Sequence, residues 1–380
     1  MPIRILHITK DDKFFDRLIT LFESDQRLVN KSVVINETKK PFKYITLIDK
    51  ARSVTVSELK HLLKQGNYDV VYYHSIPETI WRSISWIPKS KKIIWWSWGY
   101  DLYRSRLPYF RPLFTLDLYK AQTKRYIDEH DANNHNNGNI YRRIIAIVKA
   151  HYLEHCRRKA LSRIDYYIPV IPQEYDMLVN NYGFKAHLFS DPTSNRKYDF
   201  ILPQKNVAPG SILLGNSASI SNNHLDVWSA IKNTKIIKRT IILPVNYGDI
   251  VYRNYLKDHI CSVHNEIVFL EDYLPFDEYN RILDKCRFAL FGIIRQQALG
   301  NVILCIQRGI KLFFFEDSMV YRYLKEMGCF VYTIEKMNEY EISTPLSEKE
   351  AEHNYIVWSK YRSKCYQLYN SVINRLTEEI

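Results

Sequence analysis

The segment from Gly215 to Asp226 has the small and polar residues of a phosphate-binding turn. It follows the short apolar run from Ser211 to Leu214 and leads into a helical pattern. A strand that breaks at glycine and serine before a helix lets backbone N–H groups approach an anion, and the helix N-terminus adds a partial positive charge of roughly half an electron. The same pattern also makes the ordinary corner of an α/β unit. Gly215, Asn216 and Ser217 are therefore either an anion cradle or a structural turn.

A second strand–loop–helix segment runs from Arg295 to Asn301 and includes Gln296 and Gln297. Arg295 can neutralise a diphosphate through paired hydrogen bonds, and Gly300 permits close approach of the backbone. Glu316 and Asp317 end the next apolar run, where they could accept hydrogen bonds from ribose hydroxyls or cap a helix N-terminus. Together with the Gly215 turn, these residues predict a nucleotide diphosphate site in the second half of the chain.

Two residues in the first half are candidates for proton chemistry. Asp101 follows a run of three tryptophans within four residues, and His74 closes the apolar run that begins at Val70. A carboxylate among indole rings would be desolvated and could act as a base, and a histidine at the same sheet edge could do so as well. Asp101 could equally be a structural cap and His74 a hydrogen-bonded structural histidine. The sequence leaves the choice of base between them open.

Short β-branched and aromatic runs that alternate with helical patterns must position these residues. This alternation predicts doubly wound parallel sheets, and 380 residues exceed what one core usually holds. A boundary near Gln204 to Gly210, flanked by prolines, gives two α/β domains. The candidate strands are residues 3–8, 32–35, 44–48, 70–73, 93–96 and 166–170 in the first half, and 211–214, 240–243, 267–270, 288–294, 312–315 and 330–333 in the second.

The composition excludes several classes of protein. The first residues turn polar too soon for a signal peptide, and no apolar run approaches the roughly 20 residues that cross a bilayer, so we expect a cytoplasmic protein. The six cysteines are isolated, which predicts neither a zinc site nor a disulfide framework. The chain also lacks an Asp-x-Asp motif, a common arrangement of carboxylates around a metal ion. We therefore expect no metal and no cofactor.

The positive charge is concentrated in one region. Between Arg82 and Arg163 there are 17 Lys and Arg against 6 Asp and Glu, which accounts for most of the net charge of +13. Within it, Arg142, Arg143, Arg157 and Arg158 are interleaved with apolar residues in a helical pattern. Such a basic amphipathic helix suits an anionic membrane surface, although it could also be a solvated helix face. No helix-turn-helix, RNA-recognition or zinc-finger signature supports nucleic-acid binding.

In order along the chain, several of these motifs resemble those of glycosyltransferase family 56, the TDP-N-acetylfucosamine:lipid II N-acetylfucosaminyltransferases. The resemblance rests on Trp98 to Tyr103, on Gly215-Asn216-Ser217 followed by Asn222 and His224, on Leu243 to Tyr247, and on Arg295-Gln296-Gln297 with Gly300. It extends from about Val71 to Trp358. Tyr100, Ala298 and Asn301 depart from the family pattern, and the stretch from Asp128 to Tyr152 is longer than the family suggests. These departures bear on the identity of the sugars more than on the reaction.

The resemblance implies a GT-B fold, with two Rossmann-like domains and a cleft between them. We expect an acceptor- and membrane-facing domain over residues 1–205, a nucleotide-sugar domain over 206–345, and a C-terminal helix over 346–380 that returns to the first domain. The donor, a dTDP-sugar by resemblance, would contact Asn222, His224 and Tyr247 besides the residues named above. The acceptor would be a polyprenyl-diphosphate-linked oligosaccharide at the cytoplasmic face of the inner membrane, as in synthesis of enterobacterial common antigen.

Two other functions fit parts of the sequence. A non-hydrolysing sugar-nucleotide epimerase shares the two-domain plan and would bind the same donor, but it needs neither a lipid acceptor nor a basic amphipathic region. A nucleic-acid-binding adaptor would explain the charge, but it leaves the Gly215 and Arg295 segments without a purpose. We therefore predict a metal-independent hexosyltransferase, with Asp101 or His74 as the base.

Overall fold

The computed structural model describes residues 1–12, 14–105, 107–131, 140–190, 192–195, 199–201, 210–232, 239–262 and 265–379. The chain divides into two compact units. The first unit comprises Met1–Thr115, Asn137–Arg196 and Arg362–Ile380, and the second comprises Leu116–Asn136 and Lys197–Tyr361. The boundary expected near Gln204 to Gly210 lies almost entirely outside the described residues.

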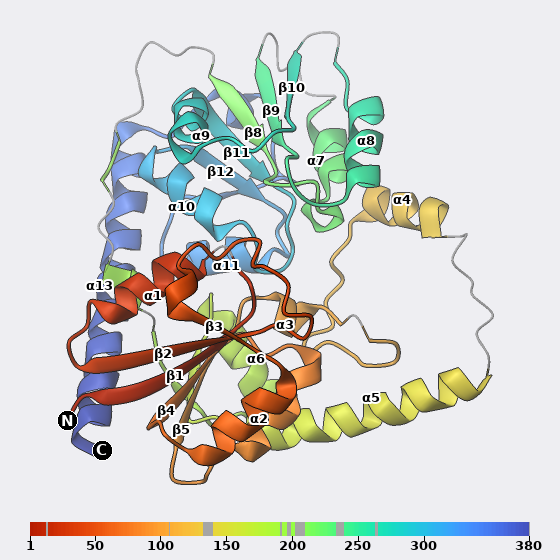
Figure 1. The fold of residues 1–380 in the computed structure, drawn as a ribbon. Helices are drawn as coiled ribbons and strands as arrows, with labels where there is room; N and C mark the ends of the chain where they lie inside the picture. The colour runs from red at the N-terminus through yellow and green to blue at the C-terminus, as the bar shows by residue number, and fades with distance from the viewer. Residues whose placement is uncertain are drawn as a thin grey trace. The chain divides into compact units, whose positions relative to one another are not determined.

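The first unit is built on a seven-stranded parallel sheet with the order β3-β2-β1-β4-β5-β6-β7 (Figure 1). Its strands are β1 Ile3–Thr9, β2 Leu28–Ile35, β3 Ala51–Val54, β4 Val70–His74, β5 Lys92–Trp96, β6 Tyr166–Ile168 and β7 His187–Leu188. Its helices are α1 Phe15–Glu23, α2 Val56–Gln65, α3 Tyr100–Tyr103, α5 Ile140–Leu161 and α6 Pro172–Tyr182, with 3₁₀ turns η1 Ile48–Lys50, η2 Glu78–Trp86 and η3 Pro192–Asn195. The strand order reverses between β1 and β4, which makes their carboxyl ends the switch point of this sheet.

The sequence signals fix some of these elements directly. Helix α2 begins with a capping box, in which the Thr55 side chain accepts a hydrogen bond from the backbone N–H of Glu58 and the Glu58 carboxylate accepts one from Thr55. It ends at Gly66 in the left-handed conformation that favours glycine.

The strand predicted over residues 44–48 is wrong. The carboxylate of Asp11 accepts hydrogen bonds from the backbone N–H groups of Lys43, Tyr44 and Ile45, and the carboxylate of Asp16 accepts those of Thr46 and Leu47. These carboxylates replace the partners that a neighbouring strand would supply. The strand forms instead at Ala51–Val54, where β3 pairs with β2. Strand β7 escaped the sequence analysis because it has only two residues, both exposed.

A hydrophobic core on one face of the first sheet includes the C-terminal helix. Tyr369, Val372, Ile373 and Leu376 of α13 (Glu348–Glu379) pack with side chains of β1, β4, β5 and β6. Residues 362–379 of this helix thus belong to the first unit, while Asn354 near its start hydrogen bonds to the backbone of Phe330 in the second.

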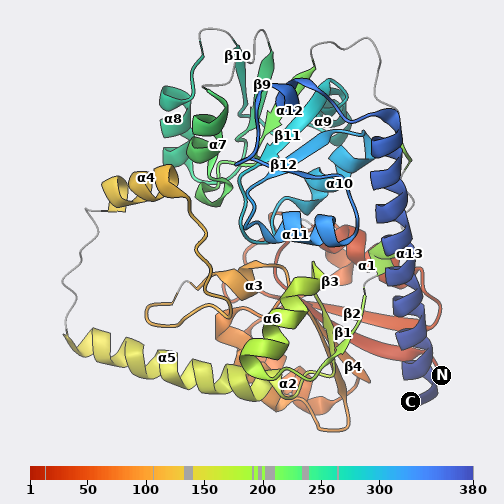
Figure 2. The same ribbon diagram turned by 180° about the vertical axis from the view of Figure 1, so that it is seen from behind.

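The second unit is built on a six-stranded parallel sheet with the order β10-β9-β8-β11-β12-β13 (Figure 2). Its strands are β8 Ser211–Leu214, β9 Thr240–Pro244, β10 Glu266–Leu270, β11 Cys286–Phe291, β12 Lys311–Phe314 and β13 Tyr332–Thr333. Its other elements are α4 Ala121–Asp131, η4 Ile220–Asn222, α7 His224–Ile231, α8 Ile250–His259, α9 Phe276–Leu283, α10 Leu299–Gln307, α11 Met319–Glu326, α12 Glu339–Ser343 and the start of α13. The strand order reverses between β8 and β11.

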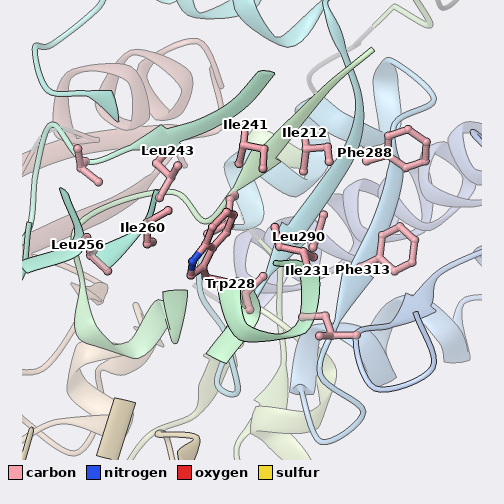
Figure 3. Close-up of a cluster of buried hydrophobic side chains, with 14 of the residues drawn as sticks. Ile212, Trp228, Ile231, Ile241, Leu243, Leu256, Ile260, Phe288, Leu290 and Phe313 are labelled. Atoms are coloured by element: carbon pink, nitrogen blue, oxygen red, sulfur yellow. The ribbon is translucent and has the colours of Figure 1, made fainter. Parts of the chain in front are cut away.

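The central strands of this sheet are buried on both faces, as their continuous apolar sequences predict. Figure 3 shows a hydrophobic core of this unit, in which Trp228 of α7 lies among side chains of the strands and of α8. Alternate residues of the strands contribute to it, including Ile212, Leu243 and Leu290. This packing fixes the positions at which the strands end and their loops begin.

Leu116–Asn136 lies between the first two segments of the first unit in sequence but belongs to the second unit. The backbone N–H of Lys120 donates to the Asn223 side chain, and those of Gln122 and Thr123 donate to the carboxylate of Asp226. Asp226 thus caps the start of α4, and Tyr126 of this helix enters the core beside Tyr252.

Candidate functional site

The segments at Gly215 and Arg295 meet at the switch point of the second sheet. β8 and β11 are hydrogen-bonded neighbours; β8 ends directly before Gly215, and β11 ends at Phe291, shortly before Arg295. In open α/β sheets, ligands bind outside the carboxyl ends of the strands at the point where the order reverses. The fold therefore brings together two segments that are about 80 residues apart in sequence.

Gly215 makes the turn that follows β8. Its φ of +70° lies in the left-handed region, and a Cβ atom there would lie 2.5 Å from Nε2 of His224. The His224 ring is fully buried beneath this turn, and neither ring nitrogen has a hydrogen-bond partner among the described residues. Burial lowers the pKa of His224 to about 3, so the ring is neutral at physiological pH. The turn thus holds a buried imidazole with its hydrogen-bonding capacity unused.

A chain of side-chain hydrogen bonds links the loops that follow β8, β9 and β11. Asn216 Nδ2 donates to the hydroxyl of Tyr247 at 2.8 Å, and Gln297 Nε2 lies 3.4 Å from Asn216 Oδ1. Ser221 Oγ donates to Gln297 Oε1 at 2.8 Å. These hydrogen bonds hold four side chains in one network, which we call the switch-point cluster: Asn216, Ser221, Tyr247 and Gln297.

Asn222 supports the same turn from inside. Its Nδ2 donates to the backbone oxygen of Ser217 at 2.9 Å and also lies 3.1 Å from the Ser217 hydroxyl. Asn222 is fully buried and Ser217 is 1 % exposed. The two residues therefore fix the conformation of the loop rather than face solvent.

The helices that begin at the switch point lack side-chain caps. The N-cap residues of α7 and α10 are Asn223 and Ala298, both in the left-handed conformation, and neither gives a side-chain cap. The next helices along the chain differ, because α8 is capped by Asp249 and α11 by Ser318. An uncapped helix start presents backbone N–H groups and a positive dipole end to an anion.

Asn223 was missed by the sequence analysis. Its Nδ2 donates to the backbone oxygens of Gly292 and Leu118, at 2.6 Å and 3.0 Å, so it ties the end of β11 to α7 instead of capping the helix. Gly292 was missed as well. It is required because a Cβ atom at this position would overlap the backbone oxygen of Asn222. A glycine directly after the apolar run of β11 is the signal that could have revealed this close approach.

The remaining donor-site candidates lie around this cluster to different extents. Arg295 Nη1 donates to the backbone oxygen of Gln296 at 2.9 Å, and both side chains are half-buried. A Cβ atom on Gly300 would meet nothing within 4 Å, so space is open there. Glu316 instead faces Glu335 and Lys336, because its backbone N–H donates to the Glu335 carboxylate and its own carboxylate lies 3.8 Å from Lys336 Nζ.

Asp101 of the first unit is held by three N–H donors. Oδ1 accepts from the backbone of Trp98 at 2.9 Å, and Oδ2 accepts from Trp95 Nε1 at 2.9 Å and from the backbone of Ile76 at 3.2 Å. Burial raises the pKa of Asp101 to about 6 despite these bonds. The carboxylate therefore ties α3 to the ends of β4 and β5.

His74 ends β4 and belongs to a buried relay that the sequence did not reveal. Its Nε2 lies 2.9 Å from Nδ1 of His7, whose Nε2 lies 2.9 Å from the Asn30 side-chain oxygen. Asn30 Nδ2 donates to the backbone of Phe22, so its oxygen must accept from His7. His7 then accepts from His74 Nε2–H, which leaves a lone pair on His74 Nδ1 with no partner among the described residues.

The environment of His74 keeps it neutral. Burial and the neighbouring His7 hold the pKa of His74 well below its ordinary value. The rings of Trp96 and Trp98 lie 6.0 Å and 6.3 Å from the His74 ring between centroids. Ser75, the next residue, has a φ of +71°, a strained conformation for a residue other than glycine. Strain of this kind concentrates at functional sites.

The basic residues of α5 do not share one environment. Arg142, Arg143 and Arg158 are exposed. Arg157 is only 3 % exposed, since its guanidinium pairs with Glu154, donates to the backbone oxygen of Arg111 and lies over the ring of Phe110. Arg157 thus anchors α5 to the first unit.

The described ranges contain no group of three or more His, Cys, Asp or Glu side chains that could hold a metal ion. No helix within these ranges has the length and apolarity needed to cross a bilayer.

Part of the chain matches a family model, and the whole chain resembles solved structures. Residues 181–351 match the family model described as 4-alpha-L-fucosyltransferase, glycosyl transferase group 56, which confirms the resemblance seen in the motifs. Sucrose-phosphate synthase from Thermosynechococcus elongatus is similar in structure, with a TM-score of 0.59, 8 % identity, and coverage of 98 % of this chain and 100 % of that one.

Two enzymes of lipopolysaccharide biosynthesis share the same architecture. The outer core galactosyltransferase WaaB has a TM-score of 0.54 and 11 % identity over 99 % of this chain and 98 % of its own. The glycosyltransferase WaaG has a TM-score of 0.52 and 8 % identity over 99 % and 100 %. The fold is GT-B, as expected, and the match of residues 181–351 to a glycosyltransferase family supports a glycosyltransferase activity.

Proposed function

We propose that this glycosyltransferase, whose residues 181–351 match group 56, transfers a 4-acetamido-4,6-dideoxyhexose or a related hexose from a nucleotide-diphosphate donor to a polyprenyl-diphosphate-linked oligosaccharide. The reaction would serve bacterial surface polysaccharide synthesis at the cytoplasmic face of the inner membrane. The family description names fucose, which is itself a 6-deoxyhexose, and a dTDP-sugar is the donor that the motif resemblance implies.

One observation carries the donor assignment: the two uncapped helix N-termini at the switch point of the second sheet. α7 and α10 both start there, next to the Gly215 turn and the switch-point cluster. A diphosphate would receive the backbone N–H groups of both helices, and Arg295 would supply the full positive charge. These groups would stabilise the charge that develops on the leaving nucleotide diphosphate.

In the proposed step, a hydroxyl oxygen of the acceptor forms a bond to the anomeric carbon of the donor sugar. The bond from that carbon to the diphosphate oxygen breaks, and the nucleotide diphosphate leaves with the electron pair. The proton of the hydroxyl passes to a base in the first unit. Every atom and electron is thus accounted for without a further reactant.

We assign the base to His74 rather than to Asp101. Both Asp101 oxygens accept hydrogen bonds from N–H groups. Loss of these hydrogen bonds would release the ends of two strands. His74 Nδ1 instead carries a lone pair that the relay through His7 and Asn30 fixes in place. Because Nδ1 is buried, the assignment requires that acceptor binding expose this nitrogen.

A panel of nucleotide sugars tests the function. A true donor at 100 times its Kd should stabilise the protein by about 2.7 kcal/mol in thermal denaturation. That donor should then yield a longer lipid-linked saccharide when a polyprenyl-diphosphate oligosaccharide is added. Conversion of the donor into its epimer without any acceptor would instead identify an epimerase. If no nucleotide sugar in the panel stabilises the protein, the proposal is refuted.

A further inference from the structure

Helix α5 exposes a row of large apolar side chains. Tyr141, Ile145 and Val148 are 73 %, 67 % and 62 % exposed, and Ile144 and Tyr152 are 53 % and 46 % exposed. Large apolar side chains that are exposed singly are common, but a contiguous set of this kind marks an interaction surface. The five residues are called the α5 stripe below.

The spacing of the stripe places it on one face of the helix. Successive residues rotate by about 100° in an α-helix, so residues 141, 144, 145, 148 and 152 lie within an arc of about 100°. The buried residues of α5 lie on the opposite side. Ala150, Leu153, Arg157 and Leu161 are all at most 6 % exposed, and Ala150 and Leu153 pack against Phe110. The helix therefore has one apolar face toward its own unit and a second toward solvent.

Basic side chains flank the stripe on both sides. By the same rotation, Arg142 and Lys149 lie along one edge of the stripe and Arg158 lies along the other, while Arg143 lies farther round the helix. All four are exposed. Lys and Arg along the border of an apolar face are the arrangement of helices that lie in the interface of an anionic bilayer.

We infer that α5 is an interfacial membrane helix, whose stripe inserts below the lipid headgroups while the flanking Arg and Lys residues contact anionic phosphates. This surface lies outside both candidate sites, and the inference holds whichever sugar or acceptor the enzyme uses. The charge decides between lipid and a second copy of the chain, because two copies joined through the stripe would bring their basic borders against each other.

Co-sedimentation with vesicles of phosphatidylcholine and phosphatidylglycerol tests the inference without any substrate. A surface attraction alone is screened at about 1 M salt, whereas inserted apolar side chains keep part of the binding. We expect the wild type to remain partly bound at high salt. Ile145→Ser with Val148→Ser should weaken binding about ten-fold or more and make it fully salt-sensitive. Arg142→Gln, Lys149→Gln and Arg158→Gln together should remove the preference for anionic lipid.

A matched control carries Ile48→Ser and Tyr340→Ser, two side chains that are 68 % and 70 % exposed elsewhere on the chain. It should bind vesicles like the wild type, and all variants should keep the wild-type melting temperature. Equal binding by the stripe variant and the wild type at both salt concentrations would overturn the inference. So would a wild-type dimer that the stripe variant converts to a monomer without any change in vesicle binding.

Discussion

The switch points of the two sheets differ in how their polar groups are satisfied. In the second unit, α7 and α10 start without side-chain caps, and the buried ring of His224 has no hydrogen-bond partner among the described residues. In the first unit, Asp101 accepts three N–H donors, and the relay from Asn30 through His7 uses one nitrogen of His74. The second switch point leaves capacity for an anion, while the first leaves a single lone pair.

This difference matches two chemical roles, the binding of a diphosphate and the action of a base. A diphosphate carries several oxygens and spread charge, so a site for it needs many donors that the protein does not already use. A base needs one atom held in one protonation state, so the groups around it are best fixed. Variants that change one site at a time test this difference, and the largest effect is considered first.

The largest effect is expected from His74→Gln. Glutamine keeps a polar side chain beside His7 but lacks the basic nitrogen, so turnover should fall by about 10²–10⁴-fold. Steady-state kinetics measures this loss, and calorimetry should show unchanged donor affinity because the donor is assigned to the second unit. Turnover close to that of the wild type, with the protein fully folded, would remove His74 as the base.

Arg295→Ala should weaken donor binding by about 1.5–3 kcal/mol, the value of a hydrogen bond to a charged group. Titration calorimetry with the nucleotide sugar measures the change. His74→Gln serves as the paired control, since it alters only the first unit. An unchanged Kd would place Arg295 outside the donor site.

Asp101→Asn should lower stability by about 1–3 kcal/mol. An amide has only one accepting oxygen, so its NH₂ group would face at least one of the N–H donors from Trp98, Trp95 and Ile76. Chemical denaturation measures the loss. Should the variant unfold like the wild type but lose turnover as His74→Gln does, Asp101 would be the base instead.

Asp101 and Glu174 should contribute stability that is lost as the pH rises from about 4 to 7, whereas the buried neutral rings of His7, His74 and His224 contribute in the opposite direction. Burial raises the pKa of Asp101 to about 6 and that of Glu174 to about 7. The folded protein therefore holds these two protons more tightly than the unfolded chain, and the resulting stabilisation is complete below the unfolded values and is lost as the pH passes the folded ones. The loss from each group should be on the order of 3 kcal/mol.

Glu174→Gln tests this pH dependence most cleanly. Its amide can still accept from the backbone N–H groups of Val170 and Ile171 and donate to the Tyr103 hydroxyl, so the helix start of α6 is kept. The melting temperature of the wild type relative to this variant should fall as the pH rises from 4 to 8. Identical profiles would show that Glu174 does not titrate in this window.

The smallest effect is expected from Tyr247→Phe. The change removes the hydroxyl that accepts from Asn216, so one member of the switch-point cluster loses its partner. Donor affinity should fall by about 0.5–1.5 kcal/mol, as for one neutral hydrogen bond. A loss as large as that of Arg295→Ala would mean that Tyr247 contacts the donor directly.

The sequence predicted the elements that have strong local signals. The strands around Ser211–Leu214 and Val70–His74 were found because buried parallel strands have continuous apolar runs. The strand expected at 44–48 failed because Asp11 and Asp16, more than 25 residues away in sequence, satisfy that backbone instead. No local pattern reports such a partner.

The candidate sites could likewise be predicted from local sequence patterns only in part. Gly215 and Arg295 were visible as strand-to-helix turns, but the absence of a cap on α7 depends on where the Asn223 side chain points. His7 is one polar residue in an apolar strand, and only the pairing of β1 with β4 brings it to His74. On α5, the helical pattern was clear, yet only the packing shows that Arg157 is buried while the apolar stripe is exposed.

Hydrogen exchange with and without the nucleotide sugar identified by thermal shift tests the central claim most directly. The account predicts that the donor slows amide exchange at the turn after β8 and at the starts of α7 and α10, with little change around His74 and Asp101. Protection confined to the ends of β4 and β5, with none at Gly215 or Gly300, would contradict the assignment of the donor to the second unit.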